Sequence, residues 1–444
     1  MTRSCSSCHT GRVRLADGTV RLILGGANTE IGLHTFIGRI TSTLKGDLGE
    51  SADAPAYKAF RTQILTGLSS HEPGWFFGAG KVSPTDATNE VQTASANIDA
   101  VLALMRTMNE RRLQTIGLLE AHSYAKAPNP PSLTGGAPGL IETSGLGSVG
   151  LVRFVGPEKA DSVLPPGPSK ADVPAVWKID PTGYVNWDGT IRGFARALTS
   201  SMAVVGDPTK IDLGTNAKIQ DFLGKLPAEP YPFPIDEAAR RRGESIFQTN
   251  CAGCHALPAG RKRSDLVFNV GTDPLREQAI NTLSAGLLTK VVLSICPPTQ
   301  AECAFGAEGP IVDPSVHRGY VAGPLIGVWA VAPYLHNGSI PTLRQLLVPS
   351  LRTTTQFLRG STSYNQTDGG WEWEPSREAE LRARGDTAIA LHDLQQAGFS
   401  PVGHGSANNP MLVDGRGKSV QVAWSNNGAD KHTVDDRIAY LLSL

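Results

Sequence analysis

Hydrophobic and polar positions follow a helical period in three segments of the chain. Apolar or small residues recur near every third or fourth position between Asp236 and Asn250, and the acidic Asp236 and Glu237 suit the N-terminus of a helix. The segment 433–444 has the same spacing, and 86–122 is the longest amphipathic stretch. The pattern therefore predicts three helices, one of them at the end of the chain.

Glycine and proline interrupt this pattern almost everywhere else. The 444 residues include 48 glycines and 31 prolines, more than an average protein contains. Residues 125–174 are crowded with both and are expected to form mostly ordered loop, and 224–234 reads as a linker. The sequence predicts a mainly α, loop-rich fold with few long elements.

Charge narrows the classes of partner. Lys and Arg number 41 and Asp and Glu number 41, so the formal net charge is zero and no basic field points to nucleic acid. No apolar run reaches the roughly 18 residues of a transmembrane helix. Residues 1–4 contain no signal peptide, and we expect the N-terminus to be truncated.

Two short cysteine motifs identify the chemistry. Cys5, Cys8 and His9 form one C-x-x-C-H pattern, and the same pattern recurs in CAGCH at 251–255. Two thiols at this spacing can form thioethers with one porphyrin, and the adjacent histidine then lies under the iron. A redox dithiol, a zinc site or structural disulfides are the alternatives. They leave the trailing histidine of both copies unexplained.

The sequence therefore predicts two covalently bound hemes c and two cytochrome c-like heme domains with insertions. Cys251, Cys254 and His255 would hold the second heme, and Cys5, Cys8 and His9 the first. We place the N-terminal heme domain at 1–230, with a long helical and Gly/Pro-rich insertion, and the C-terminal heme domain at 231–444. Beyond the doubled heme motif no internal repeat is evident.

Other features of the second domain fit this prediction. The helix 236–250 leads into Cys251, and Gly243 could let it approach Tyr440 of the last helix closely, unless it is an indifferent helix glycine. Cys296 and Cys303 lie in a Pro-rich loop, where a local disulfide is plausible in an oxidising compartment. Two free thiols are the alternative.

Several segments together resemble the diheme cytochrome c peroxidase superfamily. That superfamily also holds the methylamine dehydrogenase maturation enzyme and the heme-dependent rubber oxygenases. Besides the heme pair, the resemblance rests on VNWDG at 185–189, APYLHNGS at 332–339 and GHG at 403–405. It spans most of the chain, with unmatched insertions.

The resemblance implies roles for three further residues. Trp187 matches an aromatic residue that lies between the hemes and assists electron transfer, although a core Trp above a tight turn remains open. His336 is expected in the surroundings of the C-terminal heme without binding its iron. His404 stands where relatives close to the rubber oxygenases supply the sixth ligand, so His9, His255 and His404 are the predicted iron ligands. An exposed loop His404, or ligation by Met411, is the alternative.

The sequence leaves two possibilities for the side of the first heme that lies opposite His9. An accessible position there would let peroxide or dioxygen reach iron, whereas ligation by His34 would make the heme a relay. Met105 is more readily a core residue than a ligand. In the family, a glutamate that follows the Trp-Asp-Gly segment moves a proton during O–O cleavage. This glutamate is absent here, and Asp207 is the candidate to replace it.

Three functions follow from the resemblance. The first is a peroxidase-like oxidoreductase that activates peroxide or dioxygen at the His9 heme, with His9 and Trp187 as catalytic residues and electrons arriving from a donor protein through the second heme. The second is a rubber-oxygenase-like dioxygenase, and the third a pure electron-transfer cytochrome. Heme c maturation implies a periplasmic or secreted location.

Overall fold

The computed structural model describes most of the chain outside its N-terminal third. The described ranges are 8–32, 113–133, 136–205, 211–255, 267–303, 309–314, 319–404, 411–414, 419–421 and 431–444, together with isolated positions between 55 and 62 and at 110 and 305. The chain divides into a unit made of Met1–Leu33 and Leu118–Leu444 and a second unit, His34–Gly117. In the second unit only a few residues are described, all of them helical.

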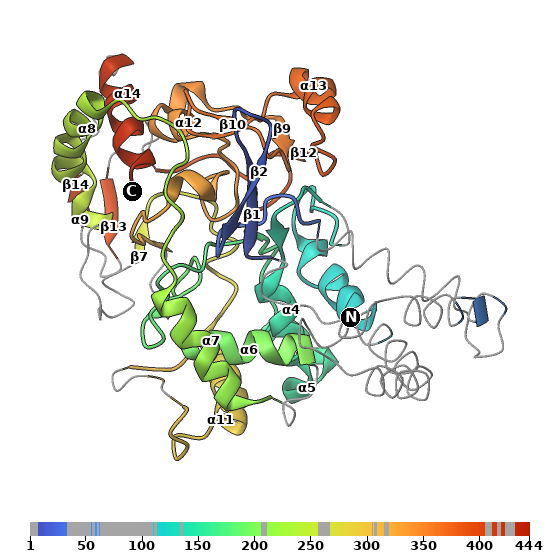
Figure 1. Cartoon of the computed structure of the whole chain (residues 1–444). Helices are drawn as coiled ribbons and strands as arrows, with labels where there is room; N and C mark the ends of the chain where they lie inside the picture. The colour runs from blue at the N-terminus through green and yellow to red at the C-terminus, as the bar shows by residue number, and fades with distance from the viewer. Residues whose placement is uncertain are drawn as a thin grey trace, which may run out of the picture. The chain divides into compact units, whose positions relative to one another are not determined.

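Helices predominate over strands, and both are mostly short (Figure 1). This confirms a mainly α, loop-rich fold. The helices are α4 Thr143–Val149, α5 Val152–Val155, α6 Gly193–Val205, α7 Leu213–Lys225, α8 Glu237–Asn250, α9 Ala252–His255, α11 Thr282–Ile295, α12 Leu343–Leu347, α13 Glu378–Ala383 and α14 Lys431–Leu442.

The strands pair in small antiparallel groups. The largest group runs in the order β14-β13-β7-β8, and the remaining pairs are β1-β2, β3-β4, β5-β6, β10-β11 and β12-β9. Their bounds are β1 Thr10–Arg14, β2 Val20–Leu24, β3 Leu140–Ile141, β4 Ala171–Asp172, β5 Tyr184–Val185, β6 Ile191–Arg192, β7 Val267–Asn269, β8 Tyr320–Val321, β9 Gln356–Arg359, β10 Tyr364–Asn365, β11 Gly370–Trp371, β12 Ala390–Asp393, β13 Met411–Asp414 and β14 Ser419–Gln421.

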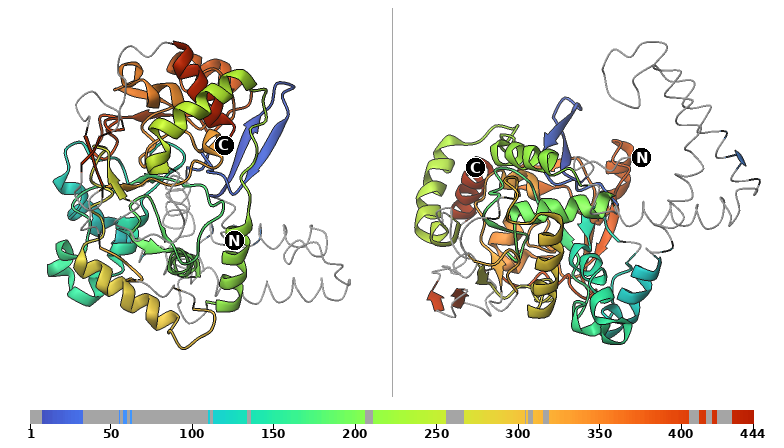
Figure 2. Two further views of the ribbon diagram at one scale, coloured as in Figure 1. Left: turned by 90° about the vertical axis from the view of Figure 1, so that its left-hand side faces the viewer. Right: turned by 90° about the horizontal axis from the view of Figure 1, so that it is seen from below.

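The predicted crossing of two helices is present. Helices α8 and α14 lie side by side in all three ribbon views (Figures 1 and 2). The Asp236 carboxylate accepts hydrogen bonds from the first backbone N–H groups of α8, as its position in the sequence indicated. A Cβ at Gly243 would lie 1.9 Å from the Asp436 carbonyl oxygen and 2.8 Å from Tyr440 Cβ, so only glycine permits this approach.

The Gly/Pro-rich stretch 125–174 is ordered, and loop makes up just over half of its described residues, as expected. It contains α4, α5 and the strands β3 and β4. Glu142 explains the local order, because its buried carboxylate accepts hydrogen bonds from Gly145 N at 3.2 Å, Ser169 N at 2.9 Å and Tyr124 Oη at 2.7 Å. One side chain thus begins a helix and fixes two loops, which glycine and proline content alone does not reveal.

The structure contains an internal repeat that the sequence analysis missed. The turn at 185–191 and the turn at 334–340 have the same conformation. Each begins and ends with a strand pair, Val185 with Ile191 and Tyr334 with Ile340. In each, the second residue has a positive φ (69° and 68°), and so does the glycine (62° and 57°) that donates its N–H back to that residue.

The repeat extends beyond these turns. Strands β3 and β4 correspond to β7 and β8, and the helices after the turns, α6 and α12, also correspond. Lys178 (φ 47°) donates its N–H to the Leu226 carbonyl just after α7, as Gly327 (φ 66°) donates to Leu444 just after α14. Helix α7 is therefore the counterpart of α14.

Two hydrogen bonds join the two copies of the repeat. Asp172 N donates to the His336 carbonyl at 2.7 Å, and Val321 N donates to the Trp187 carbonyl at 2.8 Å. Asp172 and Val321 are equivalent positions, as are Trp187 and His336. The two copies thus exchange the same bond in both directions, as in an isologous contact between subunits.

Aromatic residues form the core around the second copy. Trp329, Tyr364 and Trp371 are buried there. From the expected linker, Tyr231 packs edge to face against Trp329 and Tyr364, and Phe233 stacks on Tyr364. Two residues of the segment 224–234 thus pack against this core. The boundary at residue 230 remains a prediction.

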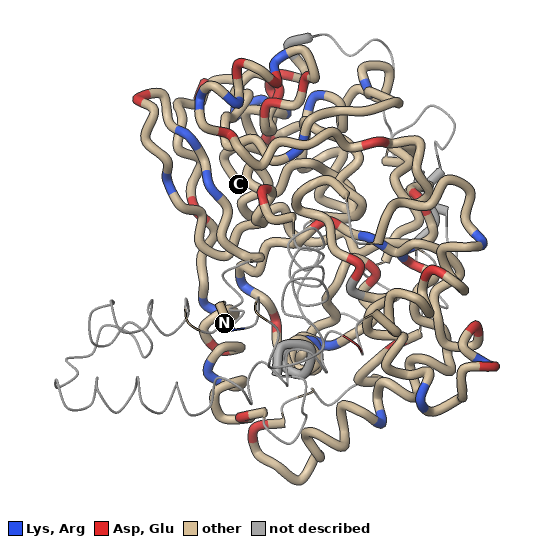
Figure 3. The backbone as a smooth tube through the Cα atoms, turned by 90° about the vertical axis from the view of Figure 1, so that its right-hand side faces the viewer, with Lys and Arg blue, Asp and Glu red and all other residues tan. Residues whose placement is uncertain are grey.

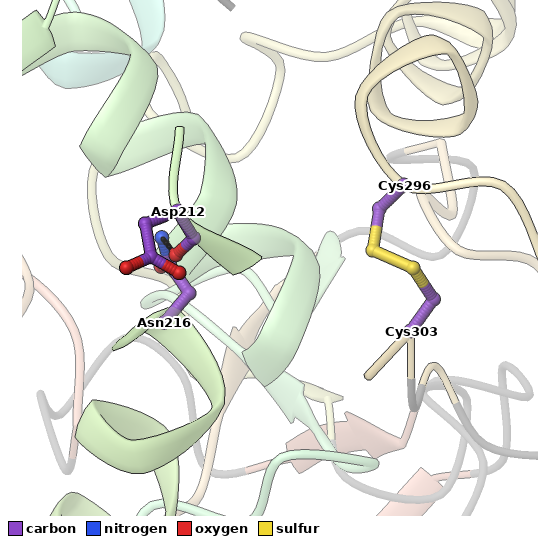
Figure 4. The surroundings of a disulfide bond; sticks show 4 residues. All are labelled: Asp212, Asn216, Cys296 and Cys303. Carbon is purple, nitrogen blue, oxygen red and sulfur yellow. Dashed lines mark hydrogen bonds between the residues drawn. A yellow bond between two sulfur atoms is a disulfide. The ribbon is translucent and has the colours of Figure 1, made fainter. Parts of the chain in front are cut away.

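The first copy has its own core and a disulfide. Phe194 and Leu198 of α6 pack with Val292 of α11 and with Cys296, and the predicted disulfide between Cys296 and Cys303 is confirmed, with 5.7 Å between the Cα atoms. Figure 4 shows it near Asp212, the residue that caps α7.

Charges of both signs are interspersed along the backbone (Figure 3), in keeping with the zero net charge.

Replacing Gly243 with alanine tests the helix crossing. The added Cβ overlaps the Asp436 carbonyl and forces α8 and α14 apart, so we expect a loss of about 1–3 kcal/mol in unfolding free energy. The measurement is the thermal midpoint of the heme-loaded protein. Gly286→Ala is the matched control, because nothing lies within 4 Å of its Cβ in α11, and alanine there stabilises by about 0.5–1 kcal/mol. Equal midpoints for both variants would contradict the close crossing.

Candidate heme-binding site

The first predicted iron ligand, His9, lies just before the β1-β2 hairpin. Its Nδ1 lies 3.0 Å from the Pro174 carbonyl oxygen. The backbone around it is fixed by the start and end of the hairpin, since Gly25 N donates to the His9 carbonyl and Asn28 N donates to the Cys8 carbonyl, both at 2.9 Å. The imidazole therefore has a defined orientation.

His255 has the same environment in the second copy. It ends the short helix α9, which follows α8 directly, and its Nδ1 lies 3.0 Å from the Gly323 carbonyl oxygen. Gly323 occupies the position in the repeat that Pro174 occupies in the first copy. A histidine that donates Nδ1–H to a carbonyl keeps the lone pair of Nε2 for a metal.

Burial keeps both imidazoles neutral. Burial, reinforced by the charge of Arg196, lowers the pKa of His9 to about 4 against the smaller opposite effect of the Pro174 carbonyl. Burial also lowers the pKa of His255, while the Gly323 carbonyl partly offsets it. A neutral imidazole is the form that binds a metal, so at neutral pH both residues are ready as ligands.

His404 lies opposite His255. The two rings have their centroids 6.3 Å apart, with 54° between their planes. The loop brings His404 there through a left-handed turn, with φ of 108° at Gly403 and 41° at His404, and His404 N donates to the Val270 carbonyl at 2.9 Å. Burial, and then the charges of His255 and Arg352, lower the pKa of His404 to about 3.

This geometry fits a six-coordinate heme iron. Two imidazoles that each bind one metal at about 2 Å have ring centroids about 6 Å apart. The spacing of His255 and His404 matches that value. Burial raises the pKa of Cys251 and of Cys254, so both are protonated thiols at neutral pH, next to the histidine that would lie under the iron. The residues of the second motif thus fit a heme c.

Trp187 and His336 lie at the contact between the two copies. The Trp187 Nε1–H donates to the Asp172 carbonyl at 2.9 Å, and Asp172 N donates in turn to the His336 carbonyl. His336 is buried and stacks on Tyr320, with 3.9 Å between ring centroids and 10° between planes. Burial, and then the charge of Arg276, hold the pKa of His336 well below its usual value, so its ring is neutral.

Two buried ion pairs at this contact were not predicted. Arg359 donates to Asp172 Oδ1 at 2.6 Å and to the Gly338 carbonyl at 2.9 Å, and so binds both copies. Burial raises the pKa of Asp172 to about 6 against the attraction of Arg359. Arg276 donates to Asp188 at 2.6 Å beside Trp187. The partners are far apart in the sequence, so no local pattern reveals them.

Several sequence predictions lie outside the described residues. These are Cys5, His34, Met105, Asp207 and the side chain of Met411. Within the described part of the chain, no helix combines the length and the apolar character of a membrane span.

A family model of RoxA-like, cytochrome c-like proteins matches residues 319–357. The matched range contains the Gly323 carbonyl that orients His255 and the turn around His336. It supports a heme-binding oxidoreductase with a cytochrome c-like domain, and such a domain suggests heme c.

Two curated relatives come from Sinorhizobium fredii (strain NBRC 101917 / NGR234). The protein named uncharacterized protein y4iM is 35% identical over 297 residues, which cover 63% of this chain and 65% of the relative. The protein named uncharacterized protein y4iJ is 25% identical over 246 residues, covering 41% and 40%. The chain therefore spans less than two thirds of the length of either relative.

The number of hemes can be counted by mass. We expect the mature protein to carry two, and the double variants Cys5→Ala/Cys8→Ala and Cys251→Ala/Cys254→Ala each to lose one, because thioethers need the thiols. The measurement is the intact mass of denatured protein. Cys296→Ala/Cys303→Ala is the control and should keep both hemes, since its sulfurs are in the disulfide. A wild-type mass without added tetrapyrrole would end the heme c assignment.

Proposed function

We propose that this protein is an exported diheme c-type cytochrome oxidoreductase with peroxidase-like chemistry. Cys5, Cys8 and His9 hold the first heme, and Cys251, Cys254, His255 and His404 hold the second. When bound, the hemes supply the redox chemistry: the first activates peroxide or dioxygen, and the second passes electrons to it. A donor protein and a periplasmic or secreted location are part of the proposal.

The observation that supports this most is a difference between the two copies of the repeat. Both copies orient a C-x-x-C-H histidine through a backbone carbonyl at 3.0 Å. Among the described residues, only His255 has a second histidine facing it, at 6.3 Å between ring centroids. A closed relay heme and a more accessible heme is the division of labour that a two-heme oxidoreductase needs.

The residues between the sites support transfer of electrons. Trp187 donates its ring N–H to Asp172, and Asp172 lies two residues from the carbonyl of Pro174 that orients His9. Through the Val321 N–H, the Trp187 backbone is also bonded to the segment that orients His255. Trp187 therefore contacts the supports of both iron ligands, and its indole provides a polarisable group there.

Two other functions remain as alternatives. The RoxA-like match favours a rubber-oxygenase-like dioxygenase, in which the first heme and dioxygen attack an apolar substrate. A pure electron-transfer cytochrome would result if a residue such as His34 closed the first heme. Product analysis with peroxide plus an electron donor, against dioxygen plus a polyisoprenoid, separates the peroxidase from the oxygenase.

Carbon monoxide binding tests the assignment of the two hemes. We expect the reduced wild type to bind one CO for every two hemes, at the first heme. His404→Ala should bind two and should change the second heme from low-spin to high-spin, because one imidazole ligand is lost. Optical and electron paramagnetic resonance spectra report both changes. An unchanged spectrum in His404→Ala would refute this ligand, and a wild type that binds no CO would favour the electron-transfer function.

Replacing Trp187 with phenylalanine tests the route between the hemes. The variant loses the N–H bond to Asp172 and the larger ring, so we expect electron transfer between the hemes to slow on the order of tenfold, about 1.4 kcal/mol of barrier. The rate is followed by rapid-mixing spectroscopy after the second heme is reduced. Trp177→Phe is the control, because Trp177 also donates its ring N–H to a carbonyl, that of Leu24, but takes no part in the hydrogen bonds of Trp187, Asp172 and Val321. Equal slowing in both variants would rule out a specific path through Trp187.

A further inference from the structure

Arg352 makes an unusual set of hydrogen bonds. All five of its N–H groups point at backbone carbonyl oxygens, one for each donor that a guanidinium has. Two of these carbonyls end helix α12 and three belong to the loop that carries His404. The distances are 3.0 Å to Gln345, 3.0 Å to Leu346, 2.9 Å to Pro401, 2.7 Å to Gly403 and 2.9 Å to His404.

The charge of Arg352 is balanced by dipoles. Burial lowers the pKa of Arg352 to about 10, which still leaves it cationic at neutral pH. Its five hydrogen bonds all go to carbonyl oxygens, and those of Gln345 and Leu346 lie at the C-terminus of α12, where the helix dipole is negative. The guanidinium therefore draws the loop carbonyls toward the helix end.

The His404 loop needs such an external support. His404 has a φ of 41°, a left-handed conformation that side chains other than glycine seldom adopt, and it follows Gly403 with φ of 108°. A Cβ at Gly403 would lie 2.7 Å from Thr272 N, so the loop is pressed against its neighbour. The His404 N–H donates to the Val270 carbonyl, and the His404 carbonyl accepts from Arg352.

The repeat shows that this support belongs to the second copy. Helix α6 continues through Val205, whereas its counterpart α12 already ends at Leu347. After Leu347 the chain turns at Val348 and Pro349 and brings Arg352 back beneath the helix end. The shortened helix thus creates the place for the guanidinium.

We propose that Arg352 is the positioning residue that fixes His404 as the sixth ligand of the second heme iron and so closes that heme to external ligands. The inference rests on the proposed function, in which His404 binds this iron. Arg352 acts through the loop backbone and does not itself touch the iron.

Arg352→Ala tests the proposal in the heme-loaded protein. We expect the second heme to become partly high-spin and CO binding to rise from one toward two per protein, as in His404→Ala. Added imidazole should restore the low-spin spectrum of Arg352→Ala, because the heme itself is intact and only the ligand has moved. A low-spin second heme that still excludes CO in Arg352→Ala would overturn the role of Arg352.

Two further variants keep the result interpretable. Arg344→Ala is the matched control: Arg344 also lies on α12 and is largely buried, but it pairs with Asp368 and Asp435 and not with the His404 loop, so CO binding should stay at one. Arg352→Lys keeps the positive charge but has only three N–H donors. It replaces Arg352→Ala as the test if the alanine variant does not yield heme-loaded protein. We expect it to bind more CO than the wild type, and the wild-type value would count against the proposal.

The reference variant His404→Ala distinguishes a failure of the His404 ligand assignment from a failure of the positioning role of Arg352. If His404→Ala stays low-spin, the ligand assignment itself is wrong, and the proposed function fails at that point. If His404→Ala opens the second heme and Arg352→Ala does not, only the positioning role is refuted.

Discussion

The pair of backbone hydrogen bonds between Asp172 and His336 and between Val321 and Trp187 is the constraint on which the rest of the structure depends. Each bond joins a strand of one copy of the repeat to the turn of the other copy. Those strands lead directly into the carbonyls that orient His9 and His255, and the turns present Trp187 and His336. A shift of one copy against the other would therefore disturb both candidate iron ligands and the aromatic groups between them at the same time.

The two copies differ where their tasks would differ. The first copy has a long α6, an Asp188 that accepts a hydrogen bond from Arg276, and a half-buried Arg196 whose charge acts on His9. The second copy has neutral Asn337 in place of Asp188, and its amide donates to the Gly398 and Ser400 carbonyls near the His404 loop. One backbone frame thus supports two different electrostatic and steric environments, which is how a duplicated module can acquire an open and a closed site.

Local patterns predicted local features well. The helix before Cys251, the last helix, the close approach at Gly243 and the disulfide follow from helical period, capping residues and short sequence separation. The repeat escaped notice because only Gly189 and Ile191 of the first turn recur as identical residues in LHNGSI at 335–340, while the shared feature is backbone conformation. The roles of Arg352 and Arg359 were not predicted, because their partners are carbonyls and a carboxylate that only folding brings near.

The disulfide has a practical consequence for biophysical work. With Cys296 joined to Cys303, and the other four cysteines committed to porphyrin in the proposed mature protein, no thiol would be left to react with a maleimide. A single cysteine introduced on the surface would then be the sole attachment point for a spin label or a fluorophore. Each heme would serve as a natural quencher, so one labelled position could report its distance to two fixed internal references.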